Sequence, residues 1–138
     1  MMSESPCVFC QIIRGEAPAS IVYEDEQVVA FLSNRPVNVG HTLVVPKKHY
    51  VNVYEMSEDD AAHAFKVAKR LAHAVRDAFG AEGIRLVQNN GRDAAQVVMH
   101  VHVHVIPMSS QNKFRPPEPA PRSIELLNAD AKILRQRL

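Results

Sequence analysis

The most constraining feature of this sequence is the pentapeptide His100-Val101-His102-Val103-His104, which lies inside a longer apolar run. β-Branched residues alternate here with histidines, and this alternation is the period of a β-strand. Successive side chains of a strand point to opposite faces, so residues two apart share a face at roughly 6.6–6.8 Å spacing. We therefore expect the valines to enter a core while the three imidazoles lie together on the other face.

A row of three histidines is chemically unusual because each ring titrates near pH 6.5 when unperturbed. The row could be the solvent face of an amphipathic strand. It could also bind zinc, since histidines at i and i+2 can do so, although no Asp or Glu ligand lies within the run or just after it. A third interpretation is nucleophilic catalysis at phosphorus, with one neutral imidazole attacking and a second binding phosphate or moving the proton of the leaving group.

Length and charge narrow the class of protein. The 138 residues predict one domain, long enough to bury a core without cross-links. Sixteen basic against fifteen acidic side chains argue against nucleic-acid or membrane partners recruited by bulk charge. Residues 1–6 carry no basic head or apolar stretch, and no run approaches the length of a membrane span. We expect a cytoplasmic protein.

Hydrophobic periodicity and turn signals predict an α+β fold. A long helix is expected from 56 to 80, with Ser57 as its cap, Asp60 at the capping-box position and Gly80 as its stop. A brief helix is expected over 7–14. Strands are expected at 21–23, 28–32, 42–46, 84–88 and 97–106. Together these elements predict a five-stranded antiparallel meander sheet with one long helix and a short N-terminal helix.

The C-terminal part has a different character. Five of the nine prolines lie between 107 and 121, which predicts an extended arm over 109–138 after a core of about 7–108. A short terminal helix over 123–138 is possible within this region, with Asn128 as one candidate cap. The whole chain is expected to be a single domain, 1–138.

Several motifs together resemble the histidine triad (HIT) family of nucleotidyl hydrolases and transferases, in particular its bacterial members with a zinc-binding Cys-x-x-Cys. The sequence His-Val-His-Val-His-Val-Ile resembles the family signature, and the resemblance covers about 7–108. The other matching segments are Phe9–Ile13, Gly15-Glu16, Val22–Asp25, Val29–Leu32, Gly40–Lys47 and Asn89–Gly91. The resemblance implies the HIT-like fold and a homodimer whose sheets join edge to edge beside the long helix and the fifth strand.

The resemblance also implies a mechanism. His102 would attack the α-phosphate of a nucleotide derivative, and water would then release a nucleoside monophosphate from the nucleotidyl-histidine intermediate. His104 and His41 match the phosphate-contacting histidine and an upstream histidine beside the triad. The implied substrate-binding residues are Ser33, Asn34, Asn89, Gln96, Val97 and His104, with Gln96 and Val97 acting through their backbone.

The leaving group is open between two branches of the family. One branch cleaves phosphorus–nitrogen bonds in purine nucleoside phosphoramidates, and the other cleaves dinucleoside polyphosphates. Ser33 stands where the first branch has an aspartate for the ribose, Val97 where it has a serine near the leaving group, and Ala95 replaces a glycine. The Asn34-Arg35 step resembles the second branch. These departures also leave open a nucleotide-binding or scaffold protein with vestigial catalysis.

Cys7-x-x-Cys10 has three interpretations from the residues alone: a redox pair, two thiols without a special role, or half of a tetrahedral zinc site. No strand precedes the pair as a thioredoxin-like motif would need. The resemblance implies that His49 and His100 complete a zinc site with the two cysteines. Four protein ligands leave no position for substrate, so we expect structural zinc and no catalytic cofactor.

Overall fold

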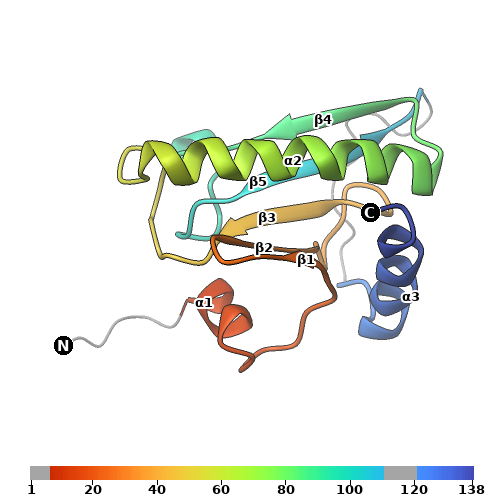
Figure 1. Ribbon diagram of the computed structural model, residues 1–138, viewed down its shortest axis with the longest axis horizontal. Helices are drawn as coiled ribbons and strands as arrows, with labels where there is room; N and C mark the ends of the chain where they lie inside the picture. Colours follow the sequence, from red (N-terminus) through yellow and green to blue (C-terminus); the bar gives the residue numbers. More distant parts are fainter. Residues whose placement is uncertain (1–6, 111–120) are drawn as a thin grey trace.

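The computed structural model describes residues 7–110 and 121–138 as a five-stranded sheet with helices packed around it (Figure 1). The strands are β1 (Ile21–Glu24), β2 (Val28–Leu32), β3 (Thr42–Pro46), β4 (Gly83–Val87) and β5 (Val103–Met108). The helices are α1 (Val8–Ile13), α2 (Glu58–Phe79) and α3 (Ile124–Arg135), and η1 (Arg92–Ala94) is a short 3₁₀ turn. Within these described ranges, no helix is both long enough and apolar enough to cross a membrane.

All neighbouring strands of the sheet are antiparallel, in the order β1-β2-β3-β5-β4. The predicted α+β class and antiparallel sheet are therefore confirmed, but only β1 to β3 form a simple meander, because β5 lies between β3 and β4. The expectation that the fifth strand forms an edge is wrong, since β5 is paired on both sides. The outer strands are β1 and β4, and the homodimer itself stays a prediction.

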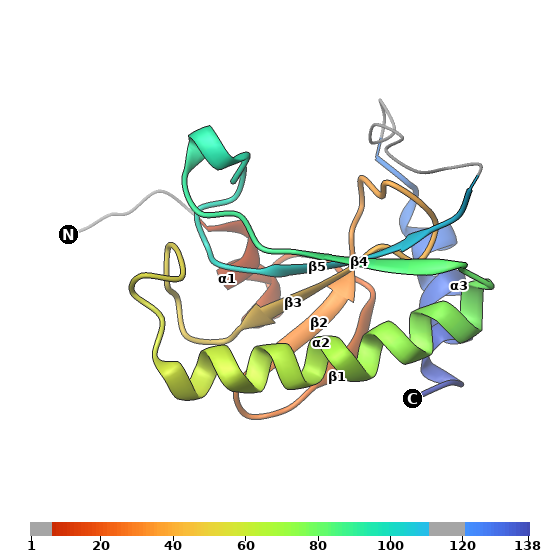
Figure 2. The same cartoon turned by 90° about the horizontal axis from the view of Figure 1, so that it is seen from above.

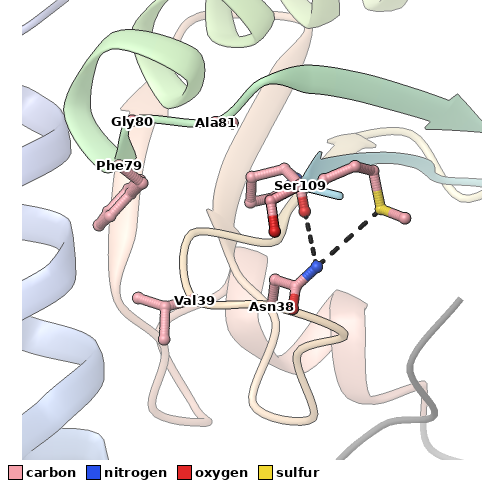
Figure 3. Close-up of a pocket in the computed structure, with 8 residues that line it drawn as sticks. Asn38, Val39, Phe79, Gly80, Ala81 and Ser109 are labelled. Carbon is pink, nitrogen blue, oxygen red and sulfur yellow. Dashed lines mark hydrogen bonds between the residues drawn. The ribbon is translucent and has the colours of Figure 1, made fainter. Parts of the chain in front are cut away.

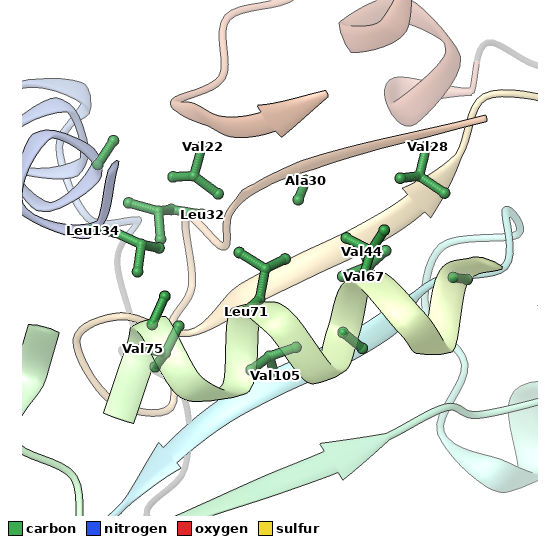
Figure 4. Packing of buried hydrophobic residues seen from close by; sticks show 14 of the residues in the cluster. Val22, Val28, Ala30, Leu32, Val44, Val67, Leu71, Val75, Val105 and Leu134 are labelled. Carbon is green, nitrogen blue, oxygen red and sulfur yellow. The ribbon is translucent and has the colours of Figure 1, made fainter. Parts of the chain in front are cut away.

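Helix α2 covers one face of the sheet and forms the main core (Figure 4). The side chain of Ser57 accepts a hydrogen bond from the N–H of Asp60, and Gly80 ends the helix in the left-handed region at φ 64°. Both signals were readable in the sequence. Buried Leu71 lies over residues of the sheet that share one face by alternation, including Val44 and Val105. Burial of this apolar stripe fixes which side of each strand faces α2.

Helix α1 lies on the opposite face of the sheet from α2 (Figure 2). Its Phe9 and Ile12 are buried in a second cluster with residues of β2 and β3, including Phe31 and Leu43. In the pairing of β3 with β5, Leu43 lies opposite His104. Directly opposite residues of an antiparallel pair project to the same face, so His104 is on the α1 side.

Helix α3 contradicts the expectation that the core ends near residue 108. Leu127, Ala131 and Leu134 are buried in the same cluster as the α2 core. Ser123 caps the helix by accepting a hydrogen bond from Leu126, whereas Asn128 lies inside the helix and accepts one from Ser20 at 2.5 Å. Proline-rich composition concealed this element, because the prolines precede the helix. Residues 111–120 of the predicted arm lie outside the described residues.

Replacing Leu134 with alanine tests whether α3 is part of the domain core. Leu134 is fully buried, so Leu134→Ala is expected to lower the free energy of unfolding by about 2–5 kcal/mol. The control is Ile133→Ala on the same helix, 44% exposed, which should cost about 0.5 kcal/mol or less. Urea denaturation followed by circular dichroism measures both. Equal effects of the two substitutions would show that α3 does not stabilise the domain.

Candidate active site and adjacent metal centre

The three histidines of the row come from two kinds of backbone. Sheet pairing begins at Val103, so only His104 lies in β5, while the chain bends over 98–100. The predicted strand over 97–106 therefore starts too early. The alternation itself is confirmed, because Val101 and Val105 are almost completely buried. His102 and His104 lie side by side, with ring centroids 4.7 Å apart.

The hydrogen bond of His102 fixes where its proton is. Its Nδ1 lies 2.8 Å from the backbone carbonyl oxygen of His100. A carbonyl oxygen only accepts, so Nδ1 carries the hydrogen and Nε2 keeps its lone pair. Burial also lowers the pKa of His102, which keeps the ring neutral near pH 7. A neutral imidazole with an unprotonated Nε2 is the form that can act as a nucleophile.

His41 and His104 form a second, linked pair. The N–H of Val37 donates to Nδ1 of His41 at 3.0 Å, so a neutral His41 carries its proton on Nε2. That Nε2 lies 3.0 Å from Nδ1 of His104 and donates to it. A neutral His104 therefore carries its own proton on Nε2. The chain of donors leaves an N–H of His104 beside the lone pair of His102.

Burial makes this pair difficult to charge. It lowers the pKa of His41 to about 3, with His104 and His102 as weaker electrostatic causes. Burial likewise lowers the pKa of His104 to about 4, assisted by His102. In the ligand-free protein at neutral pH, all three rings are therefore uncharged.

The segment after β2 brings two of the predicted substrate residues next to His41. The N–H of Ser33 donates to the carbonyl of His41 at 2.8 Å, and its Oγ accepts from the N–H of Arg35 at 3.3 Å. Asn34 is exposed, and its carbonyl accepts a hydrogen bond from the N–H of Arg122 at 2.7 Å. The start of the C-terminal helix is thus tied to this segment.

The loop between β4 and β5 differs from expectation at Gln96. Its backbone N–H, expected as a phosphate donor, already donates to the carbonyl of Gly91 at 3.0 Å. Its buried side chain accepts from the N–H of Gly91 at 2.7 Å and donates to the carbonyl of Val51 at 2.6 Å. Gln96 therefore holds the loop closed. Asn89 donates to the carbonyl of Ala95 at 3.4 Å, and Val97 is 87% exposed.

Cys7, Cys10, His49 and His100 come together as a possible metal site, with their ligand atoms all within 4.8 Å of one another. Nδ1 of His49 lies 3.1 Å from Nδ1 of His100 and 3.3 Å from Sγ of Cys10. Sγ of Cys7 lies 3.3 Å from Nδ1 of His100. Bond lengths of about 2.3 Å for Zn–S and 2.0–2.1 Å for Zn–N place tetrahedral ligand atoms about 3.3–3.8 Å apart. The four residues therefore fit a tetrahedral cation.

The protonation of these ligands agrees with that fit. Nε2 of His100 lies 2.8 Å from the carbonyl oxygen of Pro46, so this nitrogen carries the hydrogen and Nδ1 points its lone pair into the cluster. Burial, assisted by the adjacent Cys7, raises the pKa of Cys10 to about 11. A bound cation would offset this cost by stabilising the thiolates.

Phe9 is a further component that no sequence pattern singled out. Its ring packs edge-on against His102, with centroids 5.1 Å apart, and against His100 at 5.8 Å. Phe9 lies between the two cysteines on α1, and its position on the apolar side of that short helix is the only signal in the sequence that could have identified it.

A separate hollow lies at the far end of β5, near the C-terminal end of α2 (Figure 3). Its volume is about 500 Å³, and Asn38 donates there to the carbonyl of Pro107 at 2.8 Å. None of the seven histidines lines it, and no acid or base is among its lining residues. The hollow is therefore distinct from the histidine cluster.

Comparison with known proteins establishes the family. The HIT domain model matches residues 14–111, and the chain belongs to the HIT family. An uncharacterized HIT-like protein of Methanocaldococcus jannaschii is 52% identical over 101 residues, which are 73% of this chain and 78% of the relative. An adenosine 5'-monophosphoramidase of Schizosaccharomyces pombe is 37% identical over 105 residues, which are 76% of each chain.

Solved structures share the fold over nearly the whole chain. A hypothetical histidine triad nucleotide-binding protein of Sulfolobus tokodaii is 41% identical, with a TM-score of 0.87, covering 95% of this chain and 91% of the other. A zinc-bound histidine triad family protein of Mycobacterium smegmatis is 36% identical, with a TM-score of 0.83 and the same coverage.

The depressed pKa of His41 predicts a pH-dependent stability. Unfolded histidine binds a proton near pH 6.5, whereas folded His41 binds one only near pH 3, so the unfolded state holds more protons in between. The free energy of unfolding should therefore fall as the pH drops from 7 to 5. Linkage puts the contribution of His41 at pH 5 on the order of 1–2 kcal/mol.

Urea denaturation of wild type and His41→Asn at pH 7, 6 and 5 measures this contribution. The difference in slope is informative because the direct cost of the substitution is the same at each pH. A shallower decline is expected for the variant. Parallel curves would contradict a neutral, buried His41.

Proposed function

We propose that this protein is a nucleotide hydrolase or nucleotidyl transferase that attacks the α-phosphate with His102. The observation that carries the proposal is the hydrogen bond from Nδ1 of His102 to the carbonyl of His100, which leaves Nε2 unprotonated. The named activity of the phosphoramidase relative supports the same class of reaction.

The first step transfers the nucleotidyl group to the histidine. The lone pair of Nε2 on His102 forms the bond to phosphorus, and the bond from phosphorus to the leaving group breaks with its electron pair on the leaving group. The modified ring is then positively charged. Its Nδ1–H still donates to the carbonyl oxygen of His100, which stabilises that charge, as an acceptor does for a catalytic imidazolium.

His104 and His41 act on the leaving group and the phosphate oxygens. The Nε2–H of His104 is the available donor, held by the hydrogen bond from His41 to its Nδ1. An anionic phosphate beside His104 favours the protonated ring, so the pKa of His104 rises when substrate binds, and the ring can supply a proton to the leaving group. Water then attacks phosphorus, and His102 departs as a neutral imidazole while the nucleoside monophosphate is released.

The proposed substrates are purine nucleoside phosphoramidates and dinucleoside polyphosphates. Ser33, Asn34, Asn89 and the backbone at Val97 are the proposed substrate contacts, and Gln96 supports the loop from within. A binding protein with vestigial catalysis is the second candidate. Two observations favour it: Ser33 offers the ribose only a short neutral hydroxyl, and the exposed side chain of Val97 has no polar atom.

Zinc is the proposed occupant of the Cys7, Cys10, His49 and His100 cluster. Two sulfurs and two imidazole nitrogens are a common structural zinc set. When bound, zinc supplies a structural cross-link that joins α1, the segment after β3 and the segment before β5.

Substitution of His102 tests the proposed reaction. His102→Ala is expected to lower kcat at least about 1,000-fold on adenosine phosphoramidate and diadenosine tetraphosphate, because the attacking atom is lost. Nucleoside monophosphate binding should change only a few-fold. His73→Ala, an exposed residue of α2, serves as the control and should retain wild-type rates.

Quenching the wild-type reaction in alkali and mapping peptides by mass spectrometry should find a nucleotidyl group on His102. Wild-type kcat in His102→Ala would contradict the covalent mechanism. Tight binding of nucleoside monophosphate without turnover of either substrate would favour the binding protein.

Metal analysis tests the zinc site. One zinc per chain is expected after dialysis at pH 7.5, and Cys10→Ser should remove most of it because a thiolate ligand is lost. Acid should also release the metal, since the ligands must be deprotonated to bind. Full retention of zinc by the double variant Cys7→Ser, Cys10→Ser would contradict this assignment.

A further inference from the structure

We propose that the Cys7, Cys10, His49 and His100 cluster positions the nucleophile, so that metal binding controls the orientation of His102 as well as stability. This inference rests on the proposed function, because it concerns the ring assigned there as the attacking group. The four ligands act through His100 and α1 and touch no reacting atom. They are positioning residues.

The first observation is that the sheet does not hold the nucleophile. Pairing of β5 with its neighbours begins at Val103, one residue after His102. The only printed backbone hydrogen bond in the preceding segment near the ring is from the N–H of Val101 to the carbonyl of Tyr50 at 2.8 Å. Residues 98–100 form a bend. Other contacts must therefore define where the ring of His102 lies.

The second observation is that His100 serves both sites. Its ring is held at two nitrogens, by the carbonyl of Pro46 at 2.8 Å and by the cluster, where Nδ1 of His49 is 3.1 Å away. Its backbone carbonyl accepts the Nδ1–H of His102. A metal ion that fixes the ring of His100 therefore also fixes the acceptor that selects the tautomer of His102.

The third observation is that α1 carries both cysteines and the aromatic wall of the nucleophile. Phe9 lies between Cys7 and Cys10 and packs edge-on against His102 at 5.1 Å. Helix α1 has only six residues, with two of them buried, and a helix this short is marginal without tertiary support. A cross-link through Cys7 and Cys10 would hold the ring of Phe9 against His102.

These two routes predict a specific kinetic effect of metal loss. When His100 and α1 become loose, Nε2 of His102 is no longer held on the line of attack, whereas contacts to the nucleotide from the β2 and β4 ends remain. A misplacement of about 1 Å can cost on the order of 100-fold in rate. We expect kcat to fall about 10- to 100-fold and KM to change less than about three-fold.

The experiment compares wild type as isolated, stripped of metal by a chelator, and reloaded with zinc. Ring ¹⁵N NMR of His102, assigned by comparison with His102→Ala, reports which nitrogen is protonated. With zinc, Nδ1 is expected to be protonated and Nε2 bare. Without zinc, the two tautomers are expected to mix, and reloading should restore both the spectrum and kcat.

Three variants separate the routes. His49→Ala should behave as metal-free protein, and His49→Cys should restore zinc and kcat, because Cys₃His is also a structural zinc set. Phe9→Leu keeps all four ligands, so it should retain zinc and still lose kcat about ten-fold or less. Dispersed amide spectra check that each variant is folded.

An unchanged His102 tautomer in folded, zinc-free protein would overturn the positioning role, as would wild-type kcat in zinc-free protein. If no nucleotidyl group is ever found on His102, the proposed function fails on its own. The response of the tautomer to zinc still decides the positioning role in that case, since it is measured without substrate.

Discussion

The hydrogen bond from His102 to the backbone carbonyl of His100 is the interaction on which the proposed chemistry depends. It assigns the proton to Nδ1 and so leaves the lone pair on Nε2. A backbone acceptor does this without a charge, which suits a ring buried among other histidines. An acidic acceptor at this position would favour a charged imidazolium, and that form cannot attack phosphorus.

Alternation divides the labour between the two faces of the sheet. The valines of the histidine row enter the core under α2, and the histidines face α1, where the metal ligands also lie. Both functions therefore share one short segment of chain, with His100 in the metal cluster and His102 and His104 in the candidate active site. His41 joins them from the start of β3, donating to His104 across the sheet. The segment is specified by packing on one side and by polar contacts on the other.

Elements defined by local signals were predictable, and those defined by partners were not. Ser57 and Gly80 set the ends of α2 through side-chain and backbone chemistry that is visible in the sequence. The start of β5 at Val103 depends on where the neighbouring strands end, and alternation alone cannot reveal that. The inward turn of Gln96 also depends on a distant carbonyl. The metal cluster and the triad were identified through family motifs, whereas Phe9 required the fold to bring α1 against them.

The central claim is that the nucleotidyl group passes through His102 before it reaches water, and stereochemistry at phosphorus tests this most directly. Each in-line displacement inverts the configuration of phosphorus. A substrate with a chiral α-thiophosphate, hydrolysed in ¹⁸O-labelled water, should therefore give product with net retention, because two displacements occur. Net inversion would mean that water attacks phosphorus directly, and it would contradict a covalent intermediate on His102.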